Sequence, residues 1–185
     1  MKRIQLFEFE DFNWFPNPIR TGMTNLLVVL HKLLGTNEVL TKLLLDIKKR
    51  HDFSQIIDLG SGSGGVMPEV VQTINNKHQV GDLKLILTDL YPNKKVAERF
   101  NKQHKNLSYL IKPVDATNLG DLPKGLKTMV NSFHHMPPNV AKRILQSAQD
   151  NKQPLLIYEI GENKIPTLLW WILLPISLAI LFIMS

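Results

Sequence analysis

Apolar and polar residues follow two different periods along the chain. Short apolar runs, typical of buried strands, cover residues 56–59, 83–89, 107–114, 126–133 and 154–159. Apolar residues recur at helical spacing over residues 66–74, 93–103 and 138–151, and over residues 21–49 with a break at 35–37. Strands that alternate with helices predict a doubly wound α/β fold with a mostly parallel sheet, which binds ligands at the carboxyl ends of its strands.

The first predicted strand runs into a glycine-rich turn, and residues 56–65 read Ile-Ile-Asp-Leu-Gly-Ser-Gly-Ser-Gly-Gly. Glycines let the backbone turn tightly and approach a ligand without an intervening Cβ. Since a helix is predicted to begin at Val66, its free N–H groups and positive dipole end would face the same crevice. This stretch therefore predicts a nucleotide-type binding site.

Two cofactor classes compete for this site. Gly60, Gly62 and Gly65 match the dinucleotide spacing G-x-G-x-x-G, and Asp89 follows at a distance suited to a nicotinamide or flavin ribose. Asp58, however, lies two residues before the first glycine, where a pyrophosphate is repelled and an ammonium is attracted. S-adenosylmethionine carries an ammonium and a sulfonium and has no phosphate, so its carboxylate would meet the helix N-terminus and its amine Asp58 or a backbone carbonyl.

Residues 54–160 resemble a class I S-adenosylmethionine-dependent methyltransferase, with a Rossmann-like fold. The family's first motif, acid-x-Gly-x-Gly-x-Gly, corresponds to residues 58–64. The resemblance implies that Asp89 holds the ribose hydroxyls, and two carboxylate oxygens suit a vicinal diol. It implies cofactor contacts from the following residues: Asp58, Gly60, Ser61, Gly62, Gly64, Asp89, Leu90 and Tyr91 beside the adenine, Asp115 and Ala116 at the adenine amine, and Asn131.

The fourth predicted strand ends at Asn131-Ser132-Phe133-His134-His135, where the family places residues that face the methyl donor and the acceptor. His134 or His135 could take a proton from the acceptor, because imidazole titrates near neutrality. Methyl transfer can also proceed by alignment of donor and acceptor alone, so a base is not required. Glu159 ends the fifth strand and could orient an acceptor amine; we expect no metal site.

Composition limits the binding partners and the cellular compartment that the sequence predicts. The 185 residues suit one main domain, and the net charge of +6 comes from scattered basic residues, so we expect a solvated surface and no nucleic-acid partner. Cysteine is absent, which excludes disulfides and thiolate metal sites. The N-terminus lacks the apolar core of a signal peptide, so we expect a cytoplasmic catalytic domain.

We expect three regions. Residues 1–50 form an aromatic arm and helices that could serve as a lid, and residues 51–164 form the S-adenosylmethionine-binding α/β domain. Residues 165–185 carry no charge and are apolar on all sides, which predicts a helix that anchors the protein to the inner face of the cell membrane. A domain of this family normally adds a sixth and a seventh strand, which we expect this sheet to lack.

The sequence thus predicts an enzyme that transfers a methyl group from S-adenosylmethionine to a small-molecule or lipid acceptor. Two alternatives stay open at this point. One is an NAD(P)-dependent oxidoreductase, if Asp89 binds the ribose of a dinucleotide. The other is a noncatalytic, membrane-tethered module that binds S-adenosylmethionine.

Overall fold

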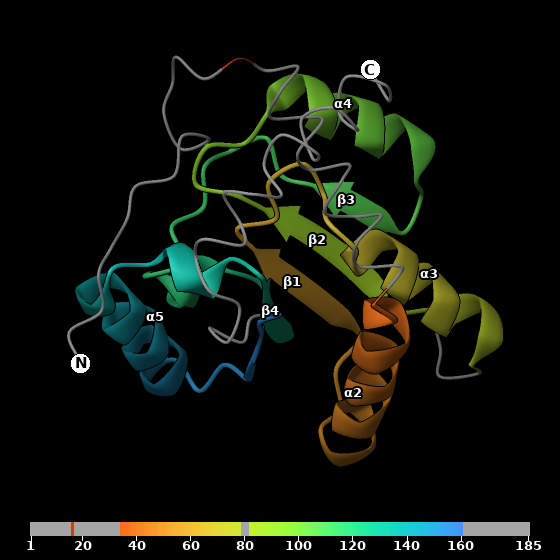
Figure 1. Cartoon of the computed structure of the whole chain (residues 1–185), viewed down its shortest axis with the longest axis horizontal. Coiled ribbons are helices and arrows are strands. Elements are labelled where there is room, and N and C mark those ends of the chain that lie inside the picture. Colours follow the sequence, from red (N-terminus) through yellow and green to blue (C-terminus); the bar gives the residue numbers. More distant parts are fainter. Residues whose placement is uncertain (1–15, 17–33, 79–81, 161–185) are drawn as a thin grey trace, which may run out of the picture. The chain divides into compact units, whose positions relative to one another are not determined.

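The computed structural model describes residue 16 and residues 34–78 and 82–160 (Figure 1). Two compact units divide the chain, His31–Glu159 and a second unit made of Met1–Leu30 and Ile160–Ser185. All helices and strands given below belong to the first unit. The aromatic arm apart from Pro16, the helix expected before the break at residue 35, and the apolar segment 165–185 lie outside the described residues. The predicted lid, membrane anchor and region boundaries therefore stay predictions.

Helices and strands alternate as the hydrophobic pattern predicts. In chain order they are α2 (Thr36–Arg50), β1 (Gln55–Leu59), α3 (Met67–Lys77), β2 (Lys84–Thr88), α4 (Lys94–Gln103), β3 (Leu107–Tyr109), the 3-10 helix η2 (Leu119–Asp121), β4 (Leu126–Val130), the 3-10 helix η3 (Phe133–His135), α5 (Pro138–Asp150) and β5 (Leu155–Tyr158). Within the described ranges, no helix combines the length and the apolar character that a membrane crossing needs.

The five strands form one parallel sheet in the order β3-β2-β1-β4-β5. The order reverses between β1 and β4, which pair directly, so the chain leaves β1 toward one edge of the sheet and returns to build the other. In sheets of this kind the crevice outside such a reversal is where ligands bind. The predicted α/β class and parallel sheet are confirmed.

Successive residues of the central strands point to opposite faces of the sheet, and each face packs on its own helices. Ile56 of β1 belongs to the apolar cluster that includes residues of α2, α3 and α4, whereas Ile57 belongs to the cluster formed with η2 and α5. Figure 1 shows α5 on the side of the sheet away from α2 and α3. Both faces are covered, which explains the continuous apolar runs in the sequence.

Two elements end earlier than the apolar pattern predicts. The third strand ends at Tyr109 instead of residue 114. The N–H groups of Leu110 and Val114 still donate to the carbonyls of Leu87, at 3.0 Å, and Asp89, at 2.8 Å, but between these bonds four residues of one segment face two of the other, so the regular pairing stops. The fourth ends at Val130 instead of residue 133, because Asn131 has a φ of 51°, outside the extended region. His134 and His135 therefore lie in η3 and not on a strand.

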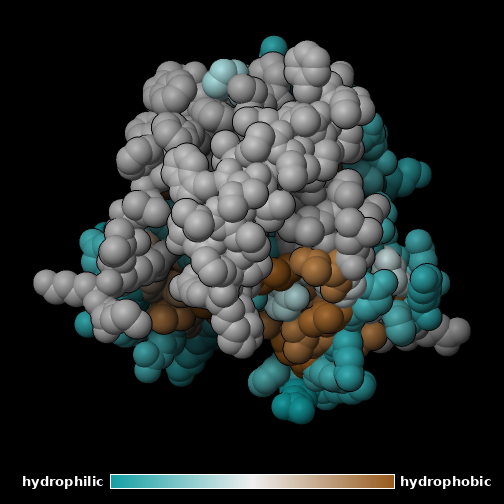
Figure 2. Space-filling model, viewed as in Figure 1, coloured by the Kyte–Doolittle hydropathy of each residue, from teal (hydrophilic) through white to brown (hydrophobic). Residues whose placement is uncertain are grey.

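The surface of the unit is mostly polar, with a few exposed apolar side chains. Figure 2 shows hydrophilic residues along the lower edges of the described part and a group of hydrophobic residues exposed between them. The large hydrophobic residues of this unit that are exposed are Leu34, Val39, Leu90, Tyr91, Ile111 and Leu145. Leu90 and Tyr91 lie in the loop after β2, at the carboxyl edge of the sheet.

Lys127 is a buried cation at the opposite end of β4 from η3. Its ammonium donates to the carbonyls of Pro123 and Gly125 and, at 3.1 Å, to Oε1 of Gln153. Burial lowers the pKa of Lys127 to about 8, since all three acceptors are neutral. The ammonium joins the loop before β4 to the turn after α5.

The core packing of α2 predicts a stability difference between two positions of the same helix. Leu44 is 1% exposed and belongs to the apolar cluster on the α2 face of the sheet, whereas Val39 is 44% exposed. We expect Leu44→Ala to lower the free energy of unfolding by about 2–5 kcal/mol, because it leaves a cavity. Val39→Ala, the control, should change it by about 0.5 kcal/mol or less. Urea denaturation measures both; similar losses would contradict the packing of α2.

Candidate functional site

The carboxylate of Asp58 lies inside the fold, near the carboxyl end of β1. The residue is 4% exposed, and its two oxygens accept hydrogen bonds from the hydroxyl groups of Thr128, at 2.6 Å, and Ser61, at 2.7 Å. Thr128 faces Asp58 in the pairing of β1 with β4. Burial raises the pKa of Asp58 from 3.8 to about 6, against the effect of the two hydroxyl bonds. Asp58 thereby joins β4 and the glycine-rich loop to β1.

Thr88, the last residue of β2, extends this network. Its Oγ1 donates to the carbonyl of Asp58 at 2.8 Å, and its carbonyl accepts from the backbone N–H of Ser61 at 2.9 Å. The N–H of Gly64 donates to the carbonyl of Ser61 at 2.8 Å, which closes a tight turn within the loop. The first part of the glycine-rich loop is therefore held by β1, β2 and β4 together.

Gly60 is the point at which the loops after β1 and β4 touch. Its φ is 67°, in the left-handed region that favours glycine. A Cβ at this position would lie 3.2 Å from both the Cβ and the Oγ of Ser132. Ser132 is buried, and its hydroxyl donates to the carbonyl of Leu59 at 3.2 Å. Any larger residue at Gly60 would push these loops apart.

Gly62 uses both of its backbone groups to reach the loops that follow β2 and β3. Its N–H donates to the carboxylate of Asp89 at 2.8 Å, and its carbonyl accepts from the hydroxyl of Tyr109. The second oxygen of Asp89 accepts from the N–H of Tyr91 at 2.8 Å. A Cβ at Gly62 would meet no atom within 4 Å, so a side chain there would project into open space. Asp89 is thus held in one orientation while it stays partly accessible to solvent.

Large apolar side chains flank Asp89. Leu90 is 45% exposed and Tyr91 is 85% exposed, and both follow Asp89 directly at the end of β2. The loop after β3 reaches the same place, because the N–H of Val114 donates to the carbonyl of Asp89 at 2.8 Å. The result is an oriented carboxylate beside exposed apolar surface.

Asp115 and Ala116 lie in the loop after β3, one residue beyond Val114. The carboxylate of Asp115 accepts from the N–H of Thr117 at 2.8 Å, and Asp115 itself is exposed. Ala116 packs against the apolar cluster on the α5 face of the sheet. Asp115 therefore shapes its own turn, and its link to the rest of the site runs through Val114 and Asp89.

Glu159, at the end of β5, holds η3 and the imidazole of His134. Its Oε1 accepts from the backbone N–H groups of Phe133, at 2.8 Å, and His134, at 3.3 Å. Its Oε2 lies 2.5 Å from Nδ1 of His134, and the rings of His134 and His135 are 4.1 Å apart between centroids.

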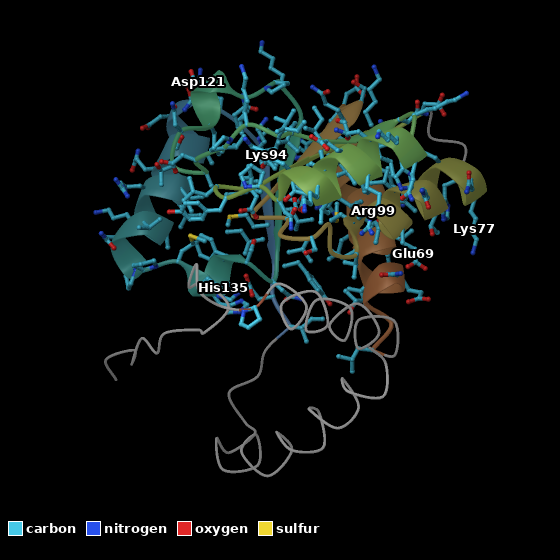
Figure 3. All side chains as sticks on the ribbon, turned by 90° about the horizontal axis from the view of Figure 1, so that it is seen from above. Glu69, Lys77, Lys94, Arg99, Asp121 and His135 are labelled. Carbon is cyan, nitrogen blue, oxygen red and sulfur yellow. The ribbon has the colours of Figure 1, made fainter. Side chains whose placement is uncertain are left out.

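Asn131, directly after β4, donates its N–H to the carbonyl of Tyr158 at 2.8 Å. Figure 3 shows His135, which follows β4, on the side of the domain opposite Asp121, which precedes it.

The structure brings most of the predicted site residues together at the carboxyl edge of the sheet. Sequence reasoning missed Thr128, Ser132 and Tyr109, and it gave Glu159 no partner. Thr128 carried a signal, since it is a polar residue inside a strand predicted to be buried, but its pairing with Asp58 depends on strand register. Tyr109 and Glu159 act through contacts that sequence spacing does not encode.

A depression on this unit lies away from the site residues, and the described residues lack the grouping that a metal ion needs. The shallow depression lies at the amino ends of β1 and β5, and it is lined by the ends of α2 and α5 and by the residues that follow them, including Arg50, His51 and Lys152. In the described ranges, no three His, Cys, Asp or Glu side chains are grouped so that they could hold a metal ion.

Comparison with known proteins identifies the fold. No protein-family model and no curated protein matches the chain. The solved structure of the DszA carbon methyltransferase matches with a TM-score of 0.54 at 15% sequence identity, over 76% of this chain and 40% of that one. The described domain therefore shares the α/β fold of this methyltransferase structure.

Two further solved structures match with lower TM-scores. A SAM-dependent methyltransferase from Aquifex aeolicus has a TM-score of 0.45 at 18% identity and covers 68% of each chain. The trans-methyltransferase CalH, in complex with SAH, has a TM-score of 0.43 at 19% identity, over 55% of this chain and 30% of that one. The chain spans less than half the length of DszA and CalH.

Burial of Asp58 predicts a pH dependence of stability. Because its pKa is raised in the folded state, the unfolded chain loses this proton first as the pH rises. Stability should therefore fall between about pH 4 and pH 6, by about 3 kcal/mol in total, and stay lower above that window. Asp58→Asn lacks this titration, so the stability of the variant relative to wild type should rise by about that amount across the window.

Chemical denaturation at pH 4 and at pH 7 measures this difference in the free energy of unfolding. The contributions of groups that titrate alike in both proteins cancel in the difference. Asp82→Asn serves as the matched control, because Asp82 is exposed just before β2. Its relative stability should not change with pH. A constant difference between Asp58→Asn and wild type would contradict the buried, partly protonated carboxyl.

Proposed function

We propose that this chain binds S-adenosylmethionine and transfers its methyl group to an acceptor. The observation that carries the proposal is the arrangement around Asp89. A partly exposed carboxylate is held by two backbone N–H groups beside a glycine-rich loop, at the carboxyl ends of β1 and β2. The shared fold with a methyltransferase structure and the motif at residues 58–64 support the same cofactor.

Asp89 would hold the ribose. Each of its oxygens accepts one backbone N–H bond, from Gly62 or Tyr91, and keeps a second lone pair for another donor. Two such acceptor sites on one carboxylate suit the two hydroxyl groups of a ribose. The exposed side chains of Leu90 and Tyr91 would then flank the adenine, and Asp115 and Ala116 would approach its amine.

The glycine-rich loop would hold the methionine part. The space beside Gly62 is open, and α3 begins at Met67, so N–H groups at its start favour a carboxylate. Asp58 is not placed to contact the ammonium directly, because the residue is only 4% exposed and its carboxylate is turned into the fold, toward the hydroxyl groups of Thr128 and Ser61. Its charge would act from behind the loop, and backbone carbonyls of the loop would accept from the ammonium.

Bound S-adenosylmethionine would supply an electrophilic methyl group on its sulfonium, and residues of the chain would align the acceptor with that methyl group. The segment from Asn131 to His135 follows β4, and its Ser132 lies against Gly60 at the start of the glycine-rich loop. An acceptor between these residues and the loop would be held in line with the methyl group. The acceptor would be a small molecule or a lipid, and the cytoplasmic, membrane-attached location stays a prediction that depends on residues 165–185.

Cofactor binding is tested by isothermal titration calorimetry with S-adenosylmethionine and S-adenosylhomocysteine. We expect wild type to bind both. Gly62→Arg should abolish binding, because its side chain fills the open space beside the loop. Asp89→Ala should weaken binding about 10-fold or more, since hydrogen bonds to a charged group are lost. Asp82→Ala, which removes an exposed acid before β2, is the control and should bind like wild type.

Circular dichroism and thermal unfolding show whether each variant is folded. Folded wild-type protein that binds neither compound, or that binds NAD instead, would refute the proposal. Binding that survives in Gly62→Arg would place the cofactor elsewhere on the domain.

A further inference from the structure

We propose that Glu159 is a positioning residue that makes His134 the proton acceptor for a hydroxyl-bearing methyl acceptor. This inference rests on the proposed function and names the class of its substrate. It is carried by three contacts of one carboxylate. Oε1 of Glu159 binds the backbone of η3 at Phe133 and His134, and Oε2 binds the ring of His134.

The pairing determines which nitrogen of His134 carries the lone pair. An ionised carboxylate is an acceptor only, so Nδ1 of His134 must donate to Oε2 of Glu159. In the neutral imidazole the other nitrogen, Nε2, then has the lone pair and can accept a proton. The backbone bonds of Oε1 prevent the carboxylate from rotating away from the ring. Glu159 thus holds both the tautomer and the orientation of His134.

The place of His134 suits this role. The side chain of His134 is 49% exposed, whereas that of Glu159 is 28% exposed, so the imidazole is the more accessible member of the pair. η3 begins directly after Ser132, which contacts the end of β1 and the position of Gly60. His134 therefore lies on the segment that borders the proposed methyl donor.

Methyl acceptors that react through a hydroxyl group are the class of substrate that needs a base such as His134. The hydroxyl oxygen forms a bond to the methyl carbon while the carbon–sulfur bond breaks, and that bond's electron pair goes to sulfur. The hydroxyl proton moves to Nε2 of His134, and the negative charge of Glu159 stabilises the resulting imidazolium at Nδ1. A thiol that ionises near neutral pH reacts as a thiolate and does not need this proton transfer.

The decisive variant is Glu159→Gln. Glutamine keeps an oxygen that can accept from the N–H groups of η3, but it presents an amide N–H to the ring, so Nδ1 of His134 must become the acceptor. The proton would then reside on Nε2 and remove the base. Glu98→Gln, an exposed acid on α4, is the matched control for the loss of one negative charge.

Nitrogen-15 NMR of the imidazoles, on the full chain with S-adenosylhomocysteine, reads the tautomer directly. His134→Gln identifies the signal of His134. We expect the Nδ1–H form in wild type and in Glu98→Gln, and the Nε2–H form in Glu159→Gln. An Nε2–H form in wild type, or no change in Glu159→Gln, overturns the inference without regard to any acceptor.

Methylation assays then test the substrate class with a panel of phenols and primary alcohols and the matching thiophenols. We expect Glu159→Gln to slow methylation of hydroxyl compounds about 100-fold and to leave thiophenol methylation within a few-fold of wild type. Equal loss for both classes, or no hydroxyl compound methylated by wild type, overturns the inference. Calorimetry with S-adenosylmethionine separates this outcome from failure of the proposed function, because cofactor binding should be the same in wild type and in Glu159→Gln.

Discussion

The hydrogen bonds that Thr128 and Ser61 donate to the buried carboxylate of Asp58 are the contacts on which the rest of the site depends. They connect the two central strands, where the strand order reverses, and they fix the start of the glycine-rich loop. Thr88 adds the neighbouring strand through the carbonyl of Asp58. Burying this carboxyl is unfavourable, as its raised pKa shows, so the sheet gives up stability to hold the loop in one shape.

Much of the fold follows from the sequence because its pattern is local. Apolar runs and helical spacing locate the described strands and helices, and the glycines with the acids after β1 and β2 locate the crevice. Strand ends were less well predicted: the pattern extends past Tyr109 and Val130 because apolar residues continue beyond the last paired backbone groups. Apolar residues signal burial, whereas the end of a strand depends on backbone pairing and on residues such as Asn131 with positive φ.

The contacts within the site are harder to predict because they join residues that are distant in the sequence. Thr128 meets Asp58 only if β4 pairs with β1 in one register, and a shift of one residue would turn its hydroxyl to the other face. Glu159 meets His134 because β5 lies next to β4. The sequence shows an acid and a histidine at strand ends, and only the strand order shows that they are neighbours.

Gly62 connects the loops after β2 and β3 with its own N–H and carbonyl, and both groups exist at every residue other than proline. The partners it needs are one acid and one hydroxyl, supplied by Asp89 and Tyr109. The contacts of Gly62 itself thus depend on the position of its backbone and on no side chain of its own. Contacts of this kind can persist while the surrounding sequence changes, and the fold itself is shared with a structure that has 15% sequence identity to this chain.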